Sequence, residues 1–329
     1  MKTKLGYTET FPIKIGTRQG CNLSPLLFNL YLNDLPQYLN NCGSNLITLN
    51  NEKVSCLLYA DDIVLLNESK TGLEKSLSLV ENYCNKWQLN VNISKTKILI
   101  FNRKFNSCLP PLKLCGKPIE YVKSFVYLGI EISNTGSFNP AISRLCSKAT
   151  RAYYSLKQEF NIYNNTNPKV IMKLYETMIV PILTYGSEIW GCFGWSKQNK
   201  LSIQNYLFNQ KVEFEKLQAK ICKNTLGIAK QTPDVTAKAE LGIYPLTTII
   251  VKNIFAYWQH ILNASENSLI HNCLVVSVNL DRNNVVSYYT RIKKLPSVLD
   301  MRQEIYKVPI KNIKSYSNKL KTRVEELYT

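Results

Sequence analysis

The sequence is short of metal-binding and disulfide patterns. It has two histidines, His260 and His271, and its 10 cysteines are scattered singly without a Cys-x-x-Cys pair. Structural zinc sites and secreted disulfide frameworks both depend on clusters of such residues. His271 and Cys273 could ligate a metal only with distant help, so we expect neither kind of site. Reduced thiols in a reducing compartment are the default expectation.

Long apolar runs are also missing. A bilayer-spanning helix needs about 18 uncharged apolar residues, and Lys252 interrupts the longest candidate, between Ile249 and Leu262. The N-terminal stretch lacks the apolar core of a signal peptide. The sequence therefore predicts a soluble, intracellular protein with no membrane partner.

Acidic residues are few compared with basic ones. Twenty-three Asp and Glu stand against 41 Lys and Arg, which gives a net charge of +18 at pH 7. Such a balance favours a polyanionic partner, nucleic acid first and an acidic membrane second. The 20 tyrosines could stack on bases, although most should be core residues. At 329 residues the chain can form two or three domains.

Two adjacent carboxylates, Asp61 and Asp62, interrupt the apolar run from Leu57 to Leu66. They are expected at the tip of a hairpin, where like charges near an apolar core would repel and lose solvation. Mg²⁺ or Mn²⁺ would neutralise them. The alternative is a simple turn, because aspartate accepts backbone hydrogen bonds in tight turns. Companion motifs must decide between the two.

A glycine-punctuated loop, residues 16–25, precedes this hairpin and leads into a helix. Ser24 is expected as N-cap and Pro25 as the first helical residue. Arg18, Gln19 and free backbone N–H groups at the mouth of the loop suit phosphates and bases. The apolar positions at helical spacing are Leu27, Leu30, Tyr31 and Leu35.

The elements after this helix predict one sheet layered under helices. A polar linker is expected at 40–53, and a helix at 70–87. Strands are expected at 98–101 and 125–132, and a short hairpin at 112–119 around Gly116. The apolar face of the 70–87 helix should consist of Leu73, Leu77, Val80 and Tyr83.

From about residue 139 the pattern becomes helical. The first helix, 142–156, has an apolar stripe and a basic side made of Arg144, Lys148, Arg151 and Lys157. This side either contacts a nucleic-acid backbone or is simply solvated. Helical pattern continues from Pro168, and the last segment, 288–329, reads as a loosely packed basic helical tail.

Four segments in order resemble polymerase motifs B, C, D and E of a non-LTR (LINE-type) retrotransposon reverse transcriptase. They are Arg18-Gln19-Gly20 with Leu23-Ser24-Pro25, then Tyr59-Ala60-Asp61-Asp62, then Lys95-Thr96-Lys97, then Tyr127-Leu128-Gly129. The segment from Lys173 to Trp190 resembles the region after the palm of these proteins, and the similarity covers roughly residues 11–247.

The resemblance implies an α+β fold with three parts. Residues 1–138 would form a partial right-hand polymerase palm, an antiparallel sheet with helices. Residues 139–235 would form a helical thumb and connection, and residues 236–329 a basic helical C-terminal region. The implied partners are an RNA template, a DNA primer or RNA–DNA duplex, and dNTP. The place of action would be the nucleus.

The resemblance also assigns roles. Asp61 and Asp62 would be catalytic carboxylates and ligands of Mg²⁺ or Mn²⁺. Lys95, or alternatively Lys97, would lie near the departing pyrophosphate. The residues implied at the template and nucleotide are Arg18, Gln19, Gly20 and Tyr59, although Tyr59 could equally be a core residue. Tyr127, Leu128 and Gly129 would be the primer grip, and Arg144, Lys148, Arg151 and Lys157 would contact the duplex backbone.

One expected part is missing. The family's third carboxylate, the motif A aspartate, precedes motif B by several tens of residues, and the fingers precede it too. Glu9 and Asp34 are implausible substitutes, because one lies in a strand-like context and the other closes a helix. We therefore expect the chain alone to be inactive. It is either a truncated copy or partial gene model of a polymerase, or a catalytically silent nucleic-acid-binding remnant.

Overall fold

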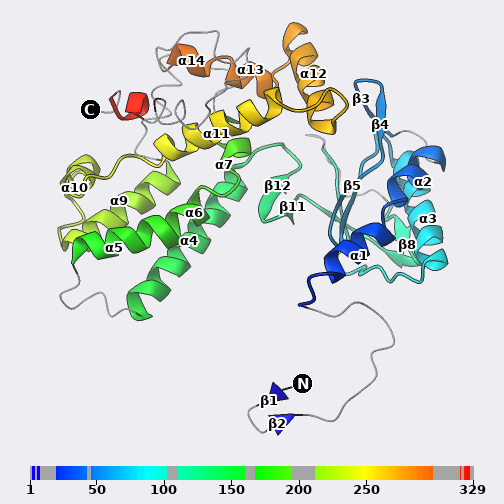
Figure 1. Ribbon diagram of the computed structural model, residues 1–329, viewed down its shortest axis with the longest axis horizontal. Helices are drawn as coiled ribbons and strands as arrows, with labels where there is room; N and C mark the ends of the chain where they lie inside the picture. The colour runs from blue at the N-terminus through cyan, green and yellow to red at the C-terminus, as the bar shows by residue number, and fades with distance from the viewer. Residues whose placement is uncertain are drawn as a thin grey trace. The chain divides into compact units, whose positions relative to one another are not determined.

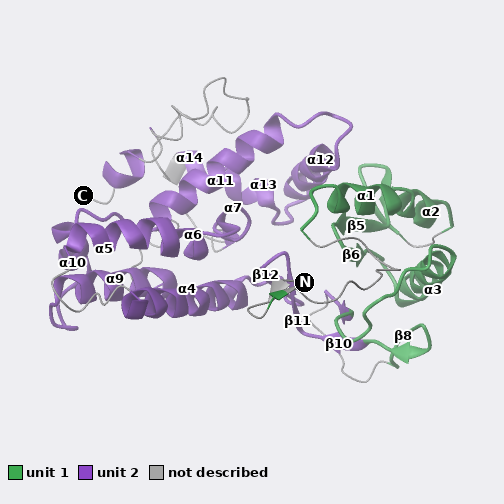
Figure 2. Cartoon of the chain, turned by 60° about the horizontal axis from the view of Figure 1, so that its bottom comes forward, with its two compact units in different colours: residues 1–96, 110–119 green, residues 97–109, 120–329 purple. Residues whose placement is uncertain are grey.

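The computed structural model describes residues 2–3, 6–7, 20–42, 46–101, 110–159, 167–193, 212–298, 319 and 322–326. It is a mixed α+β structure, mostly helical with small sheets (Figure 1), as the sequence predicts. The chain divides into two compact units (Figure 2). Unit 1 comprises residues 1–96 and 110–119, and unit 2 comprises residues 97–109 and 120–329. Nowhere in the described part is a helix long and apolar enough to cross a membrane.

The described strands pair in twos. The antiparallel pairs are β1 (Lys2–Thr3) with β2 (Gly6–Tyr7), β3 (Ile47–Leu49) with β4 (Glu52–Val54), β5 (Cys56–Tyr59) with β6 (Asp62–Leu65), β8 (Lys113–Leu114) with β9 (Lys117–Pro118), and β11 (Ser124–Tyr127) with β12 (Ile130–Ser133). One pair is parallel, β7 (Lys97–Leu99) with β10 (Glu120–Val122). The single sheet expected from the sequence is not formed by these strands. Local alternation encodes hairpins, whereas pairing between distant strands is decided by tertiary packing.

Unit 1 has three described helices: α1 (Ser24–Tyr31), α2 (Leu35–Cys42) and α3 (Lys70–Lys86). The α3 prediction is confirmed, and Leu77, Val80 and Tyr83 on its inner face are buried. They pack with residues of α2 and β5, including Leu35, Leu39 and Cys56. The linker predicted at 40–53 is partly wrong, because strands β3 and β4 lie there.

Helix α1 differs from its prediction in two ways. Leu23 is the N-cap, without a side-chain cap hydrogen bond, so Ser24 is already the first helical residue. The stripe at Leu27, Leu30 and Tyr31 is exposed, and no α1 residue is buried. A 3.6-residue period reports that one face is apolar, but it does not say that another element covers this face.

The C-terminal end of α1 is attached to α3 by hydrogen bonds. The Tyr83 hydroxyl donates to Asp34 Oδ1 at 2.5 Å and lies 3.1 Å from the Tyr31 carbonyl oxygen. Tyr31 in turn donates its hydroxyl to the Trp87 carbonyl at 2.6 Å. Burial, reinforced by the Asp34 bond, raises the pKa of Tyr83, so this hydroxyl remains a donor.

The described part of unit 2 is mostly helical, with strands β7, β10, β11 and β12, and has one main core. Its helices are α4 (Asn139–Glu159), α5 (Pro168–Leu174), a π-helical turn η1 (Tyr175–Ile179), α6 (Val180–Leu183), α7 (Ser187–Trp190), α9 (Glu213–Leu226), α10 (Asp234–Glu240), α11 (Thr247–Leu262), α12 (Leu269–Arg282), α13 (Tyr288–Ile292) and α14 (Leu295–Val298). Helices α4, α6 and α9 lie side by side (Figure 1). Trp190 and Trp258 are the largest side chains of the core.

A buried ion pair joins three helices of unit 2. Lys238 Nζ on α10 lies 2.5 Å from Glu215 Oε2 on α9, and the side chains are 1% and 2% exposed. The other carboxylate oxygen accepts hydrogen bonds from the backbone N–H and hydroxyl of Thr247 at the start of α11. Each carboxylate oxygen therefore has partners, which offsets the cost of burying the charge.

We expect Tyr83→Phe to lower the free energy of unfolding of unit 1 by about 1–3 kcal/mol, the range for a hydrogen bond to a charged group. Urea unfolding followed by tryptophan fluorescence would measure it. Tyr38→Phe is the matched control, because the Tyr38 ring lies 5.7 Å from that of Tyr83 and its hydroxyl has no hydrogen bond within the described residues. Equal effects of the two changes would contradict a role for the Asp34 bond.

Lys238→Met should lower the free energy of unfolding of unit 2 by about 3–5 kcal/mol, because Glu215 would keep a buried charge without its cation. Lys216→Met removes an exposed lysine from α9, the helix that carries Glu215. It should change the free energy of unfolding by less than about 0.5 kcal/mol. Thermal or denaturant unfolding of both variants tests this. A Lys238→Met chain as stable as the control would show that the pair is dispensable.

Candidate nucleic-acid and metal site

The hairpin β5–β6 presents the two adjacent carboxylates. Tyr59 pairs with Asp62, so Ala60 and Asp61 form a two-residue turn. Ala60 has φ +52°, in the left-handed region that alanine seldom occupies and that costs about 1–2 kcal/mol. The regular ladder between β5 and β6 holds this conformation. Such local strain is frequent at functional sites.

Both carboxylates are exposed, which corrects one part of the sequence argument. The expected desolvation next to an apolar core does not arise, because water solvates the tip of the hairpin. The oxygen donors suit Mg²⁺ or Mn²⁺ in kind. In the described part of the chain, however, no group of three or more Asp, Glu, His or Cys side chains converges as a metal site. Asp61 and Asp62 could therefore supply part of a ligand set.

Tyr59 lies beside the carboxylates on the ladder, and its side chain is 61% exposed. The alternative of a core tyrosine is therefore wrong. Gly20, the described member of the upstream loop motif, has φ +80° and open space where a Cβ would lie. Arg18 and Gln19 lie outside the described residues.

Lys95 and Lys97, the two candidates for the lysine near the departing pyrophosphate, differ in their contacts. Lys95 is exposed and lies in a turn whose backbone is fixed by Asn92, through bonds to its carbonyl and side-chain oxygens. Lys97 belongs to β7 in unit 2, and its ammonium pairs with Glu120 at 2.6 Å. Because that carboxylate already engages Lys97, Lys95 is the better candidate for contact with an anion.

The segment Tyr127-Leu128-Gly129 forms the turn of the β11–β12 hairpin in unit 2. Tyr127 pairs with Ile130, and the two turn residues have φ +46° and +83°. Sequence analysis missed a neighbour: the Tyr185 hydroxyl donates to the Leu128 carbonyl at 2.8 Å. No local pattern links residues 57 positions apart, so only the fold could reveal this contact.

The basic side of α4 divides into two parts. Arg144 and Arg151 are exposed and Lys148 is half-buried. At 100° per residue these three lie within about 60° of one another, whereas Lys157 lies about 120° or more from each. Three of the four cations therefore form one stripe.

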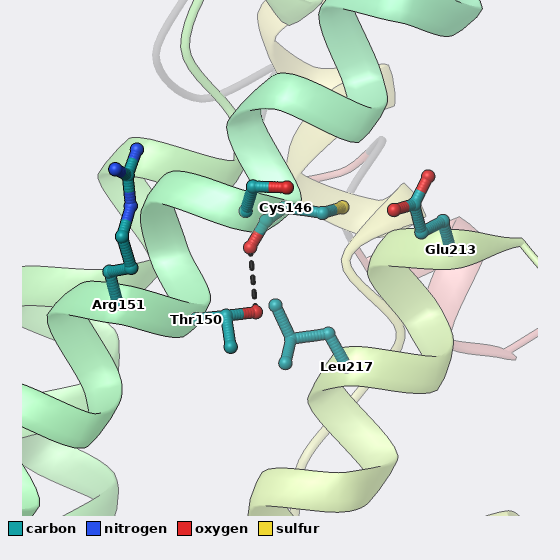
Figure 3. Close-up of a pocket in the computed structure, with 6 residues that line it drawn as sticks. Cys146, Thr150, Arg151, Glu213 and Leu217 are labelled. Atoms are coloured by element: carbon teal, nitrogen blue, oxygen red, sulfur yellow. Dashed lines mark hydrogen bonds between the residues drawn. The ribbon is translucent and has the colours of Figure 1, made fainter.

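A pocket of about 540 Å³ opens between α4 and α9 (Figure 3), lined by Cys146, Ser147, Thr150, Arg151, Glu213 and Leu217. Thr150 donates to the Cys146 carbonyl at 2.7 Å, and Glu213 accepts from Ser143 at 2.6 Å. Burial, and to a smaller degree Glu213, raises the pKa of the Cys146 thiol to about 12. The thiol is thus protonated near neutral pH and a poor nucleophile.

Sequence comparison with known proteins points to the same family as the motifs. Residues 2–132 match the family model described as reverse transcriptase (RNA-dependent DNA polymerase). Residues 2–132 are thus similar to a reverse transcriptase domain, and the relatives named below are proteins of non-LTR retrotransposons. The resemblance drawn from the motifs is confirmed at this level.

Three relatives show the extent of the match. The probable RNA-directed DNA polymerase from transposon BS of Drosophila melanogaster is 26% identical over 62% of this chain and 23% of its own length. The RNA-directed DNA polymerase from mobile element jockey of the same species is 25% identical over 60% and 22%. The Pol polyprotein from retrotransposable element R2 of Popillia japonica is 27% identical over 55% and 30%. The chain spans less than a third of each relative.

Alkylation should separate the pocket cysteine from an exposed one. With a pKa of about 12, roughly one Cys146 thiol in 10⁴ is ionised at pH 8, so iodoacetamide should modify it far more slowly than the exposed Cys115. The rate at Cys146 should still be rising above pH 10. Peptide mass spectrometry over time measures both sites, and comparable rates at pH 8 would contradict the burial of Cys146.

Proposed function

We propose that the chain is part of an RNA-directed DNA polymerase of a non-LTR retrotransposon, acting in the nucleus. The observation that carries the proposal is the exposed Tyr59-Ala60-Asp61-Asp62 hairpin tip within the segment that matches the reverse transcriptase model. The proposed parts are a palm at 1–138, a thumb and connection at 139–235, and a basic helical region at 236–329.

In the intact protein Asp61 and Asp62 would hold Mg²⁺, which supplies charge neutralisation and an acidified primer 3′-hydroxyl when bound. Lys95 would steady the departing pyrophosphate. Arg18, Gln19, Gly20 and Tyr59 would contact template and dNTP. The turn Tyr127–Gly129 would hold the primer, and Arg144, Lys148, Arg151 and Lys157 the duplex backbone.

We further propose that these 329 residues do not extend a primer by themselves. Within the described residues, two carboxylates from one hairpin leave the metals with too few protein ligands, and the transition state would lose electrostatic support. The alternative function, a catalytically silent nucleic-acid binder, is favoured by a separate observation. The net charge of +18 and the stripe of Arg144, Lys148 and Arg151 do not depend on the metal site.

Primer extension on an RNA template with Mg²⁺ tests the polymerase proposal. The unmodified chain should show no more extension than Asp61→Ala/Asp62→Ala. Robust extension by the unmodified chain alone, abolished in the double variant, would disprove the predicted inactivity while supporting the assigned carboxylates.

Duplex binding tests the basic stripe. Replacing Arg144, Lys148 and Arg151 by Gln should reduce the slope of log K against log salt by up to about 3, roughly one unit per lost phosphate contact. The matched control replaces the exposed Lys169, Lys173 and Lys230 by Gln, which removes the same charge from unit 2. Fluorescence anisotropy with a labelled RNA–DNA duplex gives both slopes, and equal slopes would rule out a specific role for α4.

A further inference from the structure

The turn Leu128–Gly129 adopts a conformation that its own sequence does not favour. Both residues have positive φ, +46° and +83°. Two-residue hairpin turns of this kind prefer Asn-Gly or Gly-Gly, because a Cβ is strained at positive φ. Glycine satisfies the second position, but leucine at the first does not. The ladder of β11 and β12 supports this strained turn, and a contact from outside the hairpin would hold Leu128 more firmly.

Tyr185 supplies that support. Its hydroxyl donates to the Leu128 carbonyl at 2.8 Å, so the strained peptide is held directly. Its ring closes the space beside the next residue, since a Cβ on Gly129 would lie 3.0 Å from Tyr185 Cε1. One side chain thus holds one turn residue by a hydrogen bond and packs closely against the other, where the positive φ also favours glycine.

Tyr185 is itself held by the core of unit 2. The buried Trp190 donates its indole N–H to the Tyr185 carbonyl at 2.8 Å. Gly186, with φ +66°, lets Ile130 approach so closely that a Cβ there would lie 2.7 Å from Ile130 Cδ1. Ser187 accepts a hydrogen bond from Asn253 on α11 at 2.9 Å. These contacts with the core and with α11 fix the backbone of segment 185–190, which carries Tyr185.

The two residues in contact are both exposed. Tyr185 remains 49% exposed and Leu128 36% exposed, although both take part in the contact. We propose that Tyr185 is a positioning residue, which fixes the Leu128–Gly129 turn so that the turn holds a primer 3′ end in one place. This inference rests on the proposed function, because it needs the turn to contact a primer.

The test compares Tyr185→Phe with the unmodified chain in two measurements. Without nucleic acid, hydrogen exchange of the amides at 128–130 should be about two- to tenfold faster, the range that loss of one hydrogen bond allows. With an RNA–DNA duplex carrying 2-aminopurine at the primer 3′ end, the protein-induced change in fluorescence should fall by roughly half or more. Overall duplex affinity should stay within about twofold, because phosphate contacts dominate it.

Tyr244→Phe is the matched control, an exposed tyrosine of unit 2 whose change should leave both readings unaltered. Moving 2-aminopurine to the duplex interior should abolish the difference between Tyr185→Phe and the unmodified chain. Tyr185→Ala, which removes the ring as well, should give a larger effect, and circular dichroism verifies that each variant folds.

The outcomes separate the two proposals. Tyr185→Phe could bind the duplex and leave both the hydrogen exchange at 128–130 and the fluorescence change at the primer 3′ end unaltered. That result would overturn the role of Tyr185 but not the proposed function. An equal loss of signal at terminal and interior positions would also overturn it, because Tyr185 would then be a general contact. Failure of the unmodified chain to bind any duplex would overturn the proposed function and this inference with it.

Discussion

Two hairpins, β5–β6 and β11–β12, depend on turn residues whose backbone lies in the left-handed region and is held by contacts outside the turn. At Leu128 the holding group is Tyr185, whose own carbonyl is fixed by Trp190 in the core. At Ala60 the regular pairing of β5 with β6 is the visible support. A strained turn keeps its conformation only while the contacts around it are intact. The geometry of the hairpin tips therefore depends on core packing.

The proposed metal chemistry would depend on a different constraint, the convergence of oxygen ligands. Asp61 and Asp62 are adjacent and exposed, so water screens most of the electrostatic repulsion between their carboxylates. Two-metal nucleotidyl transfer needs carboxylates that approach both ions from a rigid framework. Within the described residues the hairpin provides two such groups and no further cluster. The same chain keeps a basic helix, α4, whose electrostatics are independent of the metal. The proposed nucleic-acid binding and the proposed catalysis therefore depend on different residues of this polypeptide.

Sequence reasoning succeeded where local periodicity and turn chemistry coincide. Helix α3, the hairpin around Gly116 and the burial of Leu77, Val80 and Tyr83 all follow from such local signals. It failed on the face of α1, which is apolar yet exposed, and on the N-cap, where Leu23 replaces the expected Ser24. It also missed β3 and β4, because strands of three residues are too short to show the alternation that identifies a half-buried strand.

The sequence by itself determined the motif order, the positive charge, the turn at Asp61 and Asp62 and the basic stripe of α4, since these depend on neighbouring residues along the chain. Only the tertiary structure decided that Tyr59 is exposed, that Glu120 engages Lys97, and that Tyr185 contacts Leu128. Those features join residues far apart in sequence. Their free energy depends on which surfaces the fold brings together, and no local pattern records that choice.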